Sequence, residues 1–130
     1  MDLLIAMVTY LSNLGLVEGD GVDTFRDFKP EAPDNIVSLH EYSGDPISPY
    51  TDSVHRSIQV VVRNKSATAA KALALRLFDA FRKYDGAQRI DFTTECWGQV
   101  HIRQFPYKIM QDDKDRTHYG FNLGITTLIN

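Results

Sequence analysis

Two stretches of the chain carry apolar residues at the spacing of one helix face. In residues 2–14 the apolar positions follow the i, i+3, i+4, i+7 pattern, an aspartate stands at the start where it can cap the helix, and Gly15 follows as a left-handed terminator. In residues 66–84 the same spacing continues over four turns, after a serine cap and before Gly86. The pattern predicts two amphipathic helices, and the alanines of the second allow it to lie close to a sheet.

Alternation of apolar and polar residues marks four further stretches and a weaker one. Residues 36–42, 54–64, 99–105 and 118–128 alternate clearly and are bounded by turn formers or proline, whereas 22–28 alternates over a shorter and more polar stretch. In 54–64, β-branched residues occupy most of one face and polar residues most of the other. That division is typical of an antiparallel sheet with one face on a core and the other open to water.

The order of these elements predicts the fold. They run helix, short edge strand, two strands, helix, two strands, and the polar stretch 111–116 offers a turn that closes a hairpin between the last two strands. We therefore expect an α+β fold with a mostly antiparallel sheet of four to five strands and both helices packed on one face. A chain of 130 residues suits one core better than two, so residues 1–130 are expected to form a single domain.

Composition and charge argue against several classes of protein for this chain. The formal net charge is −3 and the pI is near 5.7, so the overall charge gives no reason to expect nucleic-acid recognition. The longest apolar run, 3–8, is far shorter than a membrane span, and the acidic start does not resemble a secretion signal. Cys96 is the only cysteine, which excludes an internal disulfide framework and suits a reducing cytoplasm.

Residue types that often carry chemistry are present, but none forms a catalytic or ligand-binding motif. The histidines lie on separate predicted strands without zinc-type spacing, and Cys96 stands beside a glutamate, which disfavours a thiolate. The aspartates of the 112–116 stretch lack the glycine and glutamate of a calcium loop, so a solvated hairpin tip is the simpler interpretation. We expect no catalytic residue, no metal and no cofactor. The histidines are His40, His55, His101 and His118, and the aspartates are Asp112, Asp113 and Asp115.

The first predicted helix is more apolar than one buried face requires. Leu3 and Ile5 fall outside its main apolar stripe. The plainer interpretation is a helix buried deeply in the core. The alternative is that these two residues contact another subunit.

Several segments follow one another in a characteristic order. They are the opening helix with Tyr10-Leu11, the Phe28–Pro33 segment, the strand IVSLHEYSGDP at 36–46, the strand SIQVVVRN at 57–64, the alanine-rich helix at 66–84, and QFPYKIMQDDKDRTHYGFNLGI at 104–125. As an ordered set, these segments resemble the tail terminator and minor capsid proteins of long-tailed bacteriophages and prophages. None of them is a catalytic signature.

The resemblance implies a structural protein of the virion, in its tail or neck, assembled in the cytoplasm of the bacterial host. Such proteins form a ring, expected here to be a hexamer, on the head-proximal end of the tail tube. The ring stops tube polymerisation and offers the surface on which the head docks. The implied partners are further copies of the chain, the major tail tube protein and the head–neck connector proteins, with no membrane and no direct nucleic-acid recognition.

Two alternatives stay open. One is another neck component, such as a head-closure or tail-completion protein. The other is a small enzyme or ligand-binding α+β domain, which would show a pocket with converging polar groups.

A ring made from one chain needs two different patches that meet across each contact, and turn-rich segments are candidates for them. We expect the 43–52 loop to be mobile in the free subunit and ordered on docking, with the 112–116 tip as the second candidate. The residues predicted to contact the tail tube or a neighbouring subunit are Leu3, Ile5, Gly44, Asp45, Ile47, Tyr50, Asp112, Asp113, Asp115 and Arg116.

Overall fold

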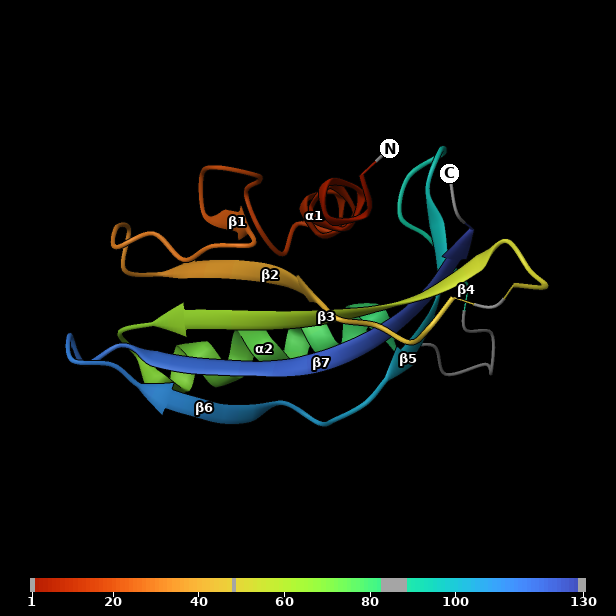
Figure 1. The fold of residues 1–130 in the computed structure, drawn as a ribbon. Coiled ribbons are helices and arrows are strands. Elements are labelled where there is room, and N and C mark those ends of the chain that lie inside the picture. The colour runs from red at the N-terminus through yellow and green to blue at the C-terminus, as the bar shows by residue number, and fades with distance from the viewer. Residues whose placement is uncertain (1, 48, 83–88, 129–130) are drawn as a thin grey trace.

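The structure is a computed structural model and describes residues 2–47, 49–82 and 89–128. Within these ranges, seven strands form one curled sheet and two helices pack against it (Figure 1). In chain order the elements are α1 (Leu3–Asn13), β1 (Thr24–Arg26), β2 (Ile36–Tyr42), β3 (Ser53–Asn64), α2 (Ala67–Phe81), β4 (Arg89–Asp91), β5 (Trp97–Ile102), β6 (Tyr107–Gln111) and β7 (Thr117–Leu128).

The sheet is organised around its two long strands, β3 and β7. They pair antiparallel along their whole lengths, from Ser53 opposite Leu128 to Asn64 opposite Thr117. The strand order is β1-β2-β3-β7-β5-β4, and β6 pairs with the part of β7 that β5 does not reach. Only β1 runs parallel to its neighbour, so the sheet is mixed.

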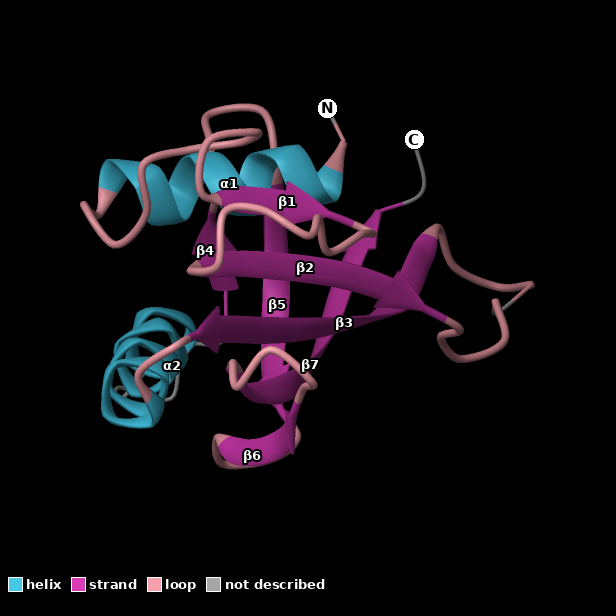
Figure 2. Cartoon of the chain, turned by 90° about the vertical axis from the view of Figure 1, so that its left-hand side faces the viewer, coloured by secondary structure: helices cyan, strands magenta, loops and turns pink. Residues whose placement is uncertain are grey.

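Both helices bury side chains against the same face of this sheet. One core cluster contains Met7 of α1 and Phe81 of α2 together with Leu39, Val60 and Phe121 from three neighbouring strands. These residues are completely or almost completely buried. Figure 2 shows α1 lying along β1 and β2 at the top and α2 beside β3 at the lower left. The prediction of two helices on one face is confirmed, because side chains of both helices belong to one core cluster with the same face of the sheet.

The expected size of the sheet is wrong, since it has seven strands and not four to five. The prediction missed β4, whose three residues are too few to give a clear alternation, and β6, whose five residues are mostly exposed and do not alternate. The predicted edge strand at 22–28 exists as the shorter β1, but it is parallel to β2. The polar turn therefore joins β6 to β7, and not β5 to β7.

The predicted starts of both helices and the predicted end of the first agree with the structure. The Asp2 side chain accepts a hydrogen bond from the Ile5 amide at 3.1 Å, and Gly15 adopts the left-handed φ of 75° that ends a helix. Ser66 caps α2 by accepting from the Ala69 amide at 3.2 Å. The predicted end of the second helix at residue 84 is wrong, because α2 ends at Phe81 and Arg82 is already extended, with φ −92° and ψ 128°. The predicted terminator Gly86 lies outside the described residues.

The second face of the sheet is less open to water than its sequence suggests. Ser57, Val61 and Arg63 of β3 point away from the helices and are nevertheless buried. The Arg103 side chain lies against Gly124 on β7, and the segment 29–34 crosses the other end of this face. Irregular segments thus cover positions that the alternation pattern assigned to solvent.

Candidate functional site

The two candidate docking segments lie at opposite ends of the β3–β7 pair. The 43–52 loop leads directly into Ser53, whereas the 112–116 turn leads into Thr117, and these two residues stand at opposite ends of the ladder. Twelve extended residues span roughly 35–40 Å. Figure 1 shows the loop at one end, between β2 and β3, and the turn between β6 and β7 at the other. The molecule therefore has two separate ends, one formed by the β2–β3 loop and the other by the β6–β7 turn.

At the end that carries the 112–116 turn, a buried guanidinium holds the turn between β6 and β7. Arg116 is 4 % exposed, and its Nε donates to Asp112 Oδ2 at 2.9 Å. The backbone amides of Lys114 and Arg116 also donate to the Asp112 carboxylate, each at 3.0 Å. These four interacting groups close the turn on itself, so the Asp112 side chain serves the turn and is not a free docking group.

The same arginine ties the turn to the segment that precedes β2. Its Nη1 donates to the Glu31 carbonyl oxygen at 2.8 Å. From β3, the buried Arg63 donates to the carbonyl oxygens of Pro33 and Asp34 at 2.7 and 3.0 Å. We call this group the brace: Glu31, Pro33, Asp34, Arg63, Asp112 and Arg116. Its hydrogen bonds hold residues 31–34, β3 and the β6–β7 turn together at this end of the molecule.

His118, at the start of β7, lies buried beside the brace. The Lys29 ammonium can only donate, so it donates to Nδ1 at 3.3 Å, and the imidazole proton stays on Nε2, which donates to Asp112 Oδ2 at 3.0 Å. Burial lowers the pKa of His118; its hydrogen bond to Asp112 opposes this effect, and the charges of Lys29 and Arg63 add to it. The same hydrogen bond from His118 is the main reason that the pKa of Asp112 lies well below its ordinary value.

The state of His118 predicts a pH dependence of stability. Because its pKa is lower in the folded chain than in the unfolded one, the unfolded chain binds the proton more readily, and stability falls as the pH falls below about 6.5. One such group contributes a slope of at most about 1.4 kcal/mol per pH unit. Burial also lowers the pKa of His40, which adds a second contribution of the same sign.

Chemical denaturation between pH 5 and 8 measures this dependence. His118→Gln keeps a side-chain N–H for Asp112 but does not titrate, so it is expected to flatten the profile. His101→Gln, at an exposed position, is the matched control and is expected to leave it unchanged. An equal slope in the wild type and in His118→Gln would contradict the assignment.

At the opposite end, the 43–52 loop between β2 and β3 is exposed along its described length. Tyr50 is 91 % exposed and Ile47 is 61 % exposed. The 43–52 segment also contains two aspartates, Asp45 and Asp52, and no lysine or arginine. At its base, Gly44 lies against the His55 carbonyl oxygen, where any Cβ would collide with it. This end presents large apolar side chains in an acidic surrounding.

The structure separates the predicted contact residues into two groups. Leu3 is 1 % exposed and belongs to the core, and Arg116 belongs to the brace, so the prediction that these two side chains offer contact surface is wrong. Asp112 is nearly buried as well. The remaining predicted residues are exposed or largely exposed, and their role in contacts stays a prediction. They are Ile5, Gly44, Asp45, Ile47, Tyr50, Asp113 and Asp115.

The sequence reasoning missed an exposed apolar strip along β6. Phe105, Tyr107 and Met110 are 64 %, 40 % and 46 % exposed. In the order of the sheet, β6 has β7 on one side and no described strand on the other. The closely spaced large residues of 105–110 are a signal for this strip, but without the register of β6 they cannot be told from core residues.

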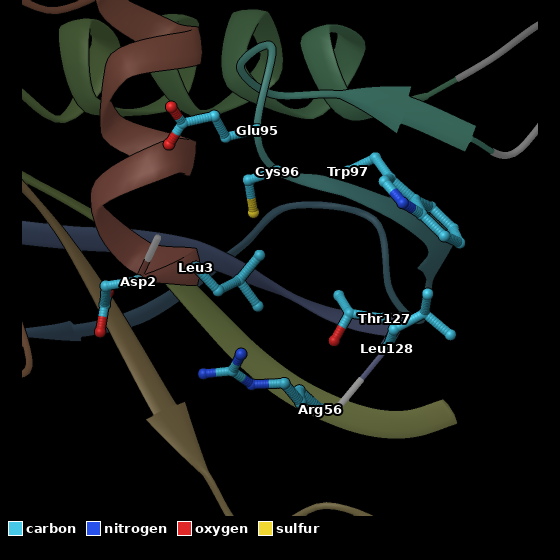
Figure 3. Close-up of a pocket in the computed structure, with 8 residues that line it drawn as sticks. All are labelled: Asp2, Leu3, Arg56, Glu95, Cys96, Trp97, Thr127 and Leu128. Carbon is cyan, nitrogen blue, oxygen red and sulfur yellow. The ribbon is translucent and has the colours of Figure 1, made fainter. Parts of the chain in front are cut away.

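A pocket of about 310 Å³ lies where the start of α1 meets β3, β5 and β7 (Figure 3). Cys96 and Thr127 both line it, and the buried Thr127 hydroxyl has no hydrogen-bond partner among the described residues. Burial raises the pKa of the Cys96 thiol, which keeps it protonated. No histidine donates to or accepts from this sulfur among the described residues, so the pocket lacks the base that an activated cysteine needs.

The described residues also bear on two other kinds of site, a metal centre and a membrane span. In the ranges 2–47, 49–82 and 89–128, no group of three or more His, Cys, Asp and Glu side chains is placed to hold a metal ion. Over the same ranges, neither helix combines the length and apolar character that crossing a membrane requires.

Exposed loops, a strand edge and solvent-facing apolar side chains are the surfaces by which one protein docks on another. By fold, the chain is an α+β protein, and its exposed surface includes features of this kind. The family model described as bacteriophage tail terminator protein matches residues 10–129, and the chain belongs to this family of structural phage tail proteins. No curated protein matches the chain.

Proposed function

We propose that this chain caps the head-proximal end of a phage tail tube as a closed ring of identical subunits, with six as the expected number. The ring stops addition of further tube subunits and offers the surface on which the head connector docks. The partners are thus other copies of the chain, the tail tube protein and the neck proteins. The protein acts by shape and transforms no molecule.

The contrast between the two ends of the β3–β7 pair carries this proposal. A terminator must recognise the tube on one side and present something other than a tube on the opposite side. The brace links three segments by hydrogen bonds at one end, while the loop exposes Ile47 and Tyr50 at the other. Membership of the tail terminator family supports assigning this asymmetry to the end of a tail.

Tube growth in the presence of the purified protein tests the proposal. Tail tube protein polymerised alone is expected to give tubes of broad and increasing length. Added chain is expected to halt growth at a length that falls as its ratio to tube protein rises, with density at one end only. Length distributions from electron microscopy provide the measurement.

Continued growth of fully decorated tubes would overturn the proposal. In a phage lysate lacking the protein, over-long tails are expected. Tails of normal length beside heads that leak their contents would instead identify a head-closure component of the neck.

A further inference from the structure

The exposed side of α2 is a basic surface in an acidic protein. Lys71, Arg76 and Arg82 are exposed there, against a single carboxylate, Asp79. Neither Lys71 nor Arg76 forms an ion pair with any residue in the described part of the chain. Leu75, which is partly buried, stands four residues after Lys71 and directly before Arg76, and Asp79 stands one turn after Leu75 on the same side of the helix. We call Lys71, Leu75 and Arg76 the helix patch.

The 43–52 loop is complementary to the helix patch both in charge and in its apolar residues. Its apolar residues, Ile47 and Tyr50, are bracketed in the sequence by Asp45 and Asp52. In the sequence, the helix patch has an apolar residue between two cations, and the loop has apolar residues between two carboxylates. An apolar centre with a charged rim of opposite sign is the composition of a protein–protein contact.

The two surfaces lie on different sides of the molecule. In Figure 2, α2 lies on one side of the sheet and the loop between β2 and β3 extends from the other. The loop therefore cannot fold back onto the helix patch of its own chain without crossing the sheet. A contact between a patch and a different patch on the next copy is the heterologous kind that generates rings.

We propose that the 43–52 loop of one subunit docks on the helix patch of the next copy of the same chain. Asp45 and Asp52 lie against Lys71 and Arg76, and Ile47 and Tyr50 cover Leu75. The proposal rests on the ring proposed above and deepens it by naming the two surfaces that close it. It also makes the loop a subunit contact and not a direct tube contact.

Charge reversal of each surface, alone and mixed, tests this contact. The loop variant is Asp45→Lys with Asp52→Lys, and the helix variant is Lys71→Glu with Arg76→Glu. Alone, each variant brings like charges together at every contact and is expected to need at least tenfold more protein than the wild type to cap half of the tubes. All four positions are exposed, so thermal unfolding should stay unchanged.

Mixing the two variants in equal amounts is expected to restore capping. In an alternating ring, the reversed loop meets the reversed helix patch, and the native loop meets the native helix patch, so every contact is again complementary. A single chain carrying all four substitutions is expected to behave in the same way. Glu18→Lys with Glu95→Lys changes the charge by as much as the loop variant, at exposed positions outside both surfaces and outside β6; it is the matched control and should cap like the wild type.

Three results would overturn the contact. Capping by the loop variant alone at wild-type concentration would exclude a role for the loop charges. Loss of capping by the loop variant without rescue by the helix variant would assign the loop to the tube protein. Capping by the helix variant at wild-type concentration would exclude the helix patch. None of these three results contradicts the proposed capping function. That function is contradicted only if the wild-type protein does not stop tube growth.

Discussion

Deletion of residues 45–51 is expected to abolish capping of tail tubes while leaving the fold intact. The deletion removes the exposed residues Asp45, Ile47 and Tyr50, and it removes no residue of the core cluster. The β2–β3 connection can still close, because Gly44 already lies beside the His55 carbonyl oxygen at the base of the loop. The effect is expected whether the loop meets a neighbouring subunit or the tube.

Two measurements separate loss of contact from loss of structure. Thermal unfolding of the deletion variant should match that of the wild type, and its tubes should grow without limit under the electron microscope. A variant in which seven glycine and serine residues replace 45–51 keeps the length of the loop. Capping by this variant would show that the side chains of the loop are dispensable, and unchanged capping by the deletion variant would reject the role of the loop.

Replacement of Gly120 by alanine is expected to cost about 3 kcal/mol of unfolding free energy, the upper part of the range for overpacked sites. Gly120 lies on β7 opposite Val61, and a Cβ there would collide with the Val60 carbonyl oxygen. That oxygen belongs to the backbone of β3, the long partner of β7. The clash can be relieved only by moving one of the two strands on which the sheet depends.

Gly124→Ala provides the matched control, because it lies on the same strand and the same face. There the nearest atoms belong to the Arg103 guanidinium, 3.1–3.2 Å from the added Cβ, and a flexible side chain can move aside. We expect a change in unfolding free energy well below that of Gly120→Ala. Urea denaturation measures both, and equal losses for the two variants would contradict this reading of the contacts.

The helices and long strands could be predicted because their signals are local. The Asp2 and Ser66 caps and the apolar spacing of each helix act within a few residues, and the alternation of Ile36–Tyr42 does the same for β2. The family resemblance depends on the same ordered set of segments, and the family match over residues 10–129 confirms it. The short β4 and β6 could not be predicted, because strands of three and five residues show too little alternation.

The placement of the candidate site residues depended on contacts between distant segments. Leu3 and Ile5 are both apolar and two positions apart, yet Leu3 is in the core and Ile5 is 38 % exposed, because the angle at which α1 lies on the sheet decides which side is covered. Arg116 was predicted at a solvated tip, but a segment more than eighty residues away accepts its hydrogen bond.

The sequence by itself determined the two helices, the main strands, the α+β class and the family, since each of these follows from patterns within short windows or from the order of such windows. Only the tertiary structure decided that Arg63 and Arg116 are buried, that the loop and the turn lie at opposite ends of the β3–β7 pair, and that the loop and α2 lie on different sides. The physical reason is that burial and proximity are set by strand register and by which segments cross each face of the sheet. Both arise from interactions between residues far apart in the chain.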